Sequence, residues 1–84
     1  MITATKAQEI REDAINMKIA QFFNPLIMKA IHETQTFVIF DISDLLGQVY
    51  VTEDYIVNYV KNLGYRIGSA DLKTYDNDIY ILYF

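Results

Sequence analysis

Hydrophobic residues recur at helical spacing through the first third of the chain, after Thr5 and Gln8, which stand in a capping-box relation. The recurring positions are Ala7, Ile10, Ala14 and Met17. The apolar stripe then widens, from Ile15 to Phe23, which indicates that the second half of this segment is enclosed on more than one side. The spacing predicts a helix from Lys6 to about Phe23.

Pro25 interrupts this pattern, because a proline inside a helix removes a hydrogen bond and clashes with the preceding turn. Asn24 and Pro25 suit the N-cap and the first position of a new helix. We therefore expect a separate short helix from Pro25 to about Glu33, and one kinked helix is the alternative.

The run Phe37 to Phe40 is β-branched and aromatic without polar alternation, which predicts a buried strand. A very short helix is expected next, started by Ser43 and stopped by Gly47. Thr52 then suits an N-cap, and a helix from Glu53 to Leu63 would end at Gly64, where glycine accepts a left-handed conformation.

The chain ends in a predicted antiparallel hairpin of Tyr65–Ile67 with Asp78–Phe84, joined by residues 71–77, whose Asp and Asn side chains suit a turn. Ile79, Ile81 and Tyr83 share one face of the terminal strand, and Tyr80, Leu82 and Phe84 share the other. Both faces are apolar, and one layer of helices from so short a chain would leave part of the strand uncovered. Either a partner or the chain's own termini would then cover it.

These elements predict an α+β fold in a single domain, residues 1–84: N-terminal helices, a strand, a short helix, a helix and a C-terminal β-hairpin. The composition, 52% hydrophobic and 14% aromatic, is that of a globular chain. Cysteine is absent, which excludes disulfides and thiolate zinc sites. No stretch approaches a membrane span or a secretion signal, so we expect no membrane association.

The net charge of −4 is unevenly distributed, since the four basic and four acidic residues of positions 1–35 balance one another. The excess lies in residues 36–84. A negative surface repels phosphate backbones, so nucleic acid is not the expected partner.

The sequence offers little catalytic chemistry. His32 is the one histidine and stands near a predicted helix end, where a partly exposed structural role is typical. The carboxylates of Asp41 with Asp44, and of Asp71 with Asp76 and Asp78, lack a recognised metal spacing and suit turns. No glycine-rich phosphate loop occurs. We expect no enzyme activity, catalytic residue, metal, cofactor or small-molecule substrate.

All seven tyrosines lie between Tyr50 and the C-terminus, and tyrosine joins a large apolar body to a polar tip. Each suits the edge of a core, yet as a group they favour a binding surface. The predicted partner-binding residues are Tyr75, Tyr80, Leu82 and Phe84.

The order of elements from about residue 36 to 84 resembles a winged helix-turn-helix domain. Residues 42–46 stand where such domains place their first motif helix, residues 51–52 where the recognition helix starts, and residues 63–67 where it passes into the wing. The resemblance implies a nucleic-acid-binding regulator, but Glu53 and Asp54 occupy the place of basic or amide groups. A winged helix of this charge is expected to bind protein instead.

The chain also resembles small uncharacterised proteins of large tailed bacteriophages, through Leu63-Gly64-Tyr65 and the terminal aromatic run 79–83. This resemblance implies a virion component or a host-takeover factor, and with it a location in the virion or in the cytoplasm of the host cell. The expected function is a non-enzymatic protein-protein interaction module that self-associates or docks on a larger protein. A winged-helix nucleic-acid-binding regulator is the alternative.

Overall fold

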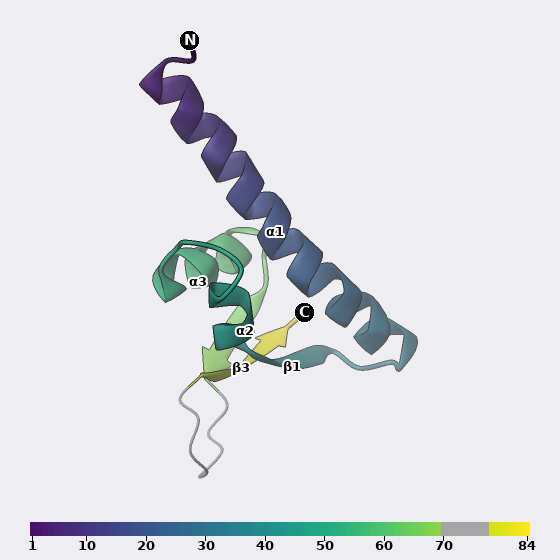
Figure 1. The fold of residues 1–84 in the computed structure, drawn as a ribbon. Coiled ribbons are helices and arrows are strands. Elements are labelled where there is room, and N and C mark those ends of the chain that lie inside the picture. The colour runs from purple at the N-terminus through teal and green to yellow at the C-terminus, as the bar shows by residue number, and fades with distance from the viewer. Residues whose placement is uncertain (70–77) are drawn as a thin grey trace.

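The computed structural model describes residues 1–69 and 78–84, which form three α-helices and three β-strands (Figure 1). In chain order they are α1 (Ala4–His32), β1 (Phe37–Asp41), α2 (Ile42–Leu46), α3 (Glu53–Asn62), β2 (Arg66–Ser69) and β3 (Ile79–Tyr83). The predicted α+β class is confirmed. Its element order is the one that the winged-helix resemblance implies.

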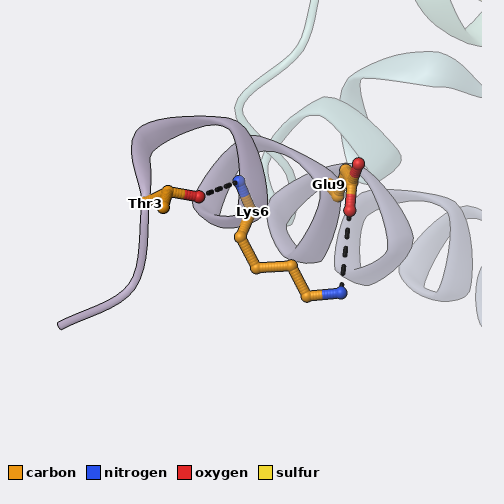
Figure 2. Close-up of polar contacts among 3 residues, drawn as sticks. All are labelled: Thr3, Lys6 and Glu9. Carbon is orange, nitrogen blue, oxygen red and sulfur yellow. Dashed lines mark hydrogen bonds and ion pairs between the residues drawn. The ribbon is translucent and has the colours of Figure 1, made fainter.

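The helix α1 begins two residues earlier than predicted, because Thr3 rather than Thr5 caps it. The Thr3 Oγ1 atom accepts a hydrogen bond of 3.1 Å from the Lys6 backbone N–H, as Figure 2 shows. This bond satisfies one of the backbone donors that a helix start leaves open. The Lys6 Nζ atom lies 3.6 Å from a Glu9 carboxylate oxygen, in an exposed pair that adds little stability.

Pro25 lies inside α1, so the prediction of two separate N-terminal helices is wrong. Pro25 and Gln21, whose carbonyl loses its partner, are both exposed, and water can bond that carbonyl. Phe23 before the proline and Ala30 after it are both buried in the core. Packing on both sides of Pro25 therefore holds the helix continuous against the local preference.

The buried residues of α1 begin at Ile15, where the sequence predicted a wider apolar stripe. They are Ile15, Ile19, Phe23 and Ala30. Before Ile15 the exposed Arg11 side chain donates a hydrogen bond of 2.8 Å to the Tyr50 carbonyl. The stripe of Ala7, Ile10, Ala14 and Met17 is exposed, and the N-terminal end of α1 projects past the other elements (Figure 1). The spacing of these four residues thus predicted the helix correctly, but they do not lie on the side of the helix that is buried.

The caps of the next two helices agree with the sequence in part. Asp41, not Ser43, caps α2: its Oδ1 atom accepts hydrogen bonds of 2.9 Å from the Ser43 N–H and 2.6 Å from the Ser43 hydroxyl. Thr52 caps α3 as predicted, accepting from the Tyr55 N–H at 3.2 Å. Gly64 takes the left-handed conformation, with φ of 98°.

The three strands form an antiparallel sheet in the order β1-β3-β2, so β3 lies between the other two. The predicted pairing of the last two strands is confirmed by direct pairs such as Ile67 with Leu82. The strand β1 pairs with the other side of β3, where Val38 lies opposite Leu82. Its burial alternates, since Val38 and Phe40 are buried while Phe37 and Ile39 are exposed. The prediction that this whole strand is buried is therefore wrong.

The core lies between the sheet and the helices. Its fully buried large side chains come from every helix and from the central strand: Ile19, Ile42, Leu45, Ile56 and Leu82. Phe23 and Phe40 add an edge-to-face aromatic contact, with ring centroids 4.9 Å apart. Because this core packs on one face of the sheet, that face points toward the helices and the other points away from them.

Candidate functional site: the outer face of the sheet

The register of the sheet sorts its residues into two faces, because side chains directly opposite one another on paired strands point the same way. On the inner face Val38, Leu82 and Ile67 form one row, with Leu82 completely buried. Phe40 and Tyr80 form the next, with stacked rings 6.1 Å apart. The helices cover this face.

The outer face carries apolar side chains that residues 1–69 and 78–84 leave exposed or, at Ile81, half-buried. Phe37 and Tyr83 are directly opposite and are each 37% exposed, while Ile39, opposite Ile81, is 56% exposed. Gly68 lies beside Ile81 on the other edge, and a Cβ atom there would meet nothing within 4 Å. We name Phe37, Ile39, Ile81 and Tyr83 the outer patch.

A cation borders the outer patch. Arg66 lies directly opposite Tyr83 on β2, and its guanidinium carbon is 5.6 Å from the centre of the Tyr83 ring. That distance is within the range of a cation–π interaction, which holds the long side chain over the ring. Phenylalanine, tyrosine and arginine, which lie around the exposed Ile39 here, are residue types that are enriched in protein interfaces.

The structure places the predicted partner-binding residues of β3 on the inner side. Leu82 has no exposed surface, and Tyr80 is half-buried. Phe84 is 40% exposed and packs edge-to-face on Tyr65, with ring centroids 6.4 Å apart. Tyr75 lies outside the described residues. The division of the terminal strand into two apolar faces is confirmed, and the face opposite Tyr80 and Leu82 carries the exposed Tyr83. Partner binding by Tyr75, Tyr80, Leu82 and Phe84 stays a prediction.

Sequence reasoning missed Phe37 and Ile39 as surface residues because the run 37–40 has no polar interruption. One signal was present. Asp41 has the same parity as Phe37 and Ile39 along the strand, so its polar side chain marks the face that meets water.

Tyr80 is tied to the helix layer rather than free for a partner. Its hydroxyl donates a hydrogen bond to a Glu53 carboxylate oxygen at the start of α3. The pKa of Tyr80 is raised to about 12, mainly by this hydrogen bond and next by the burial of the hydroxyl. Tyr55 donates similarly to the Asn16 Oδ1 atom, at 2.7 Å, and burial, with the nearby Glu12 carboxylate, raises its pKa as well. Both bonds join β3 or α3 to other elements.

We expect Tyr80 to ionise near pH 12, and the folded state to lose stability as it does so. A raised pKa means that the contribution of the Tyr80–Glu53 bond is present below the ordinary tyrosine pKa of about 10 and is lost as pH rises toward 12. Absorbance at the phenolate band during an alkaline titration measures this. Tyr80→Phe should remove the step near pH 12, whereas Tyr83→Phe should leave that step in place; a step near pH 12 that survives in Tyr80→Phe would contradict the assignment.

The described residues contain no group of three or more His, Asp or Glu side chains placed to hold a metal ion. His32, the last residue of α1, is exposed.

The first turn of α3 carries Glu53 and Asp54 as its charged groups, with Lys61 in the last turn. The start of α3, where a recognition helix would meet the bases, therefore carries only charges that disfavour nucleic-acid binding, and the absence of such binding stays a prediction. Within residues 1–69 and 78–84, no helix combines the length and the apolar character that crossing a bilayer requires.

Comparison with known proteins adds no further assignment: no family model, no curated protein and no solved structure matches this chain.

Proposed function

We propose that this chain is a non-enzymatic protein-protein interaction module that self-associates or docks on a larger protein through the outer patch. The proposal rests on the apolar cross-strand pairs of that face, in which Phe37 lies opposite Tyr83 and Ile39 lies opposite Ile81. An antiparallel sheet with one face in water normally alternates apolar and polar side chains. Here the solvent face is apolar across two strands, and such patches mark interaction sites.

The outer patch is built to meet a partner without rearrangement. Ile81 and Tyr83 stand on the central strand, which is hydrogen-bonded on both sides, so their backbone positions are fixed. The Arg66 guanidinium lies over the Tyr83 ring. Rigid aromatic and cationic groups lose little conformational freedom on binding, which favours affinity.

The biological setting that we propose is a bacteriophage accessory protein, acting as a virion component or as a host-takeover factor in the host cytoplasm. It rests on the sequence resemblance through Leu63-Gly64-Tyr65 and residues 79–83. An acidic surface with an apolar binding face agrees with either role, and the partner in both is a protein.

The double variant Ile81→Thr, Tyr83→Thr is expected to lose the association. Threonine keeps the β-strand preference while it removes most of the apolar surface, so the sheet should persist. Light scattering measures self-association, and affinity capture from the native context, read by mass spectrometry, measures docking. We expect the variant to be monomeric where the wild type associates, and to lose the partners that the wild type captures.

The matched control is Ile10→Thr, Tyr50→Thr, which makes the same two substitutions at exposed positions away from the sheet, 48% and 95% exposed. It should retain every partner. A wild-type protein that stays monomeric at high concentration, with the same captured proteins as the Ile81→Thr, Tyr83→Thr variant, would refute the outer patch as the binding surface.

A further inference from the structure

The strand β1 is an edge of the sheet within the described residues, and the ladder shows which of its backbone groups point outward. The Phe84 N–H donates to the Thr36 carbonyl at 3.0 Å, and the Ile42 N–H donates to the Asp78 carbonyl at 2.9 Å. Bonding alternates along an antiparallel pair, so even-numbered residues of β1 bond to β3. The N–H and C=O groups of Phe37 and Ile39 therefore face away from the sheet.

Two hollows follow this edge, between β1 and the second half of α1. One has a volume of about 190 Å³ and the other about 330 Å³. Both are lined by Leu26 from α1 and Ile39 from β1, so they adjoin along the strand. Phe22 and Pro25 of α1 make the wall of the larger hollow apolar. A strand placed beside β1 would thus lie beneath α1, with hollows for its inward side chains.

The charge along the groove differs between its ends. Lys29 and Glu33 line the smaller hollow and balance one another. Asp41 and Asp44 line the larger one without a lysine or arginine. Asp41 already accepts two hydrogen bonds from Ser43, whereas the Asp44 carboxylate makes no ion pair among residues 1–69 and 78–84. This end of the groove is therefore negatively charged and favours a positively charged side chain.

We propose that the groove between α1 and β1 binds an extended segment of another protein, which adds a strand to β1 and carries a basic residue toward Asp44. The proposal rests on the protein-docking function above and gives it a second, chemically defined surface. The segment runs antiparallel to β1, as the other strands do, so its basic residue lies at its N-terminal end. Its backbone bonds the outward groups of Phe37 and Ile39, as in other cases of strand addition.

The spacing of such a segment suits the two hollows. Alternate side chains of a strand lie on one face, about 6.6–6.8 Å apart. Two apolar side chains at positions i and i+2 would enter the two hollows on either side of Leu26, while the residue between them faces outward beside Ile39. The preferred segment therefore has one or two basic residues followed by alternating apolar and polar ones.

The probe is a library of eight-residue peptides that begin with two lysines and then alternate threonine with Val, Ile, Leu or Phe. The matched library begins with two glutamates. We expect members of the lysine library to bind the full chain at least tenfold more tightly than their glutamate counterparts, measured by fluorescence anisotropy. Hydrogen exchange of the Phe37 and Ile39 amides should slow in the complex, whereas the Val38 amide, already bonded within the sheet, should change little.

Two variants locate the binding on this edge. Ile39→Pro removes the outward N–H, while Ile39→Thr makes a comparable change of the side chain in the hollows and keeps the N–H, so the proline variant should bind at least tenfold more weakly than the threonine variant. Asp44→Lys, at an exposed position, should reverse the preference so that the glutamate library binds better. This charge reversal tests the site even where the proline variant fails to fold.

Absence of binding by every library member, or binding that ignores Asp44→Lys, would overturn the proposal. So would self-association that Ile39→Pro abolishes and Ile39→Thr does not, because a second copy would then occupy β1. The outcome is separable from that of the outer patch. Ile81→Thr, Tyr83→Thr changes the central strand, so peptide binding should survive it even where docking of the larger partner is lost.

Discussion

Leu82→Ala is expected to destabilise the protein by about 2–5 kcal/mol, the usual cost of truncating a buried leucine. Leu82 is completely buried on the central strand, between Val38 and Ile67. A domain of this length has a free energy of unfolding of about 4–13 kcal/mol, so the loss is a large part of the whole. Thermal or urea unfolding followed by circular dichroism measures it.

The control for this prediction is Ile39→Ala, on the other face of the same sheet. Ile39 is 56% exposed, so its truncation should cost at most about 1 kcal/mol, mainly through strand preference. Equal losses for Leu82→Ala and Ile39→Ala would show that the two faces of the sheet are equally covered. That result would contradict the division between inner and outer face on which the candidate site depends.

Pro25→Ala is expected to stabilise the protein by about 2 kcal/mol. Alanine is about 3 kcal/mol more favourable than proline inside a helix, and about 0.4–1 kcal/mol of this is offset because alanine gives the unfolded chain more freedom. The substitution restores the bond to the Gln21 carbonyl, and Pro25 is exposed, so little packing is lost. The melting temperature should rise by roughly 8–16 °C in a domain of this size.

The neighbouring change Asn24→Ala is the control, since Asn24 is exposed on the same turn and keeps its backbone N–H. It should stabilise the protein by less than about 1 kcal/mol. If Pro25→Ala lowered the melting temperature, the proline would have to contribute contacts that outweigh its cost to the helix. The continuous α1 would then depend on Pro25 rather than tolerate it.

Local chemistry was enough to predict most of the elements. The helix α3 starts after Thr52 and ends before Gly64 as expected, because a cap hydroxyl and a left-handed glycine act within one turn of the chain. The alternation along residues 79–84 separated the two faces of the last strand correctly. The starts of α1 and α2 were misplaced by one or two residues, since Thr3 and Thr5, or Asp41 and Ser43, are both competent caps and only the packed structure selects one of each pair.

The sequence by itself determined the α+β class, the elements and the presence of more apolar strand surface than the helices could cover. Only the tertiary structure decided that α1 continues through Pro25 and that the sheet face with the exposed Phe37, Ile39 and Tyr83, rather than the face of Leu82, points away from the helices. The physical reason is the same for both. Burial is a property of distant partners: Val38 meets Leu82 across 44 positions of sequence, and no local pattern states which apolar face the helices will cover.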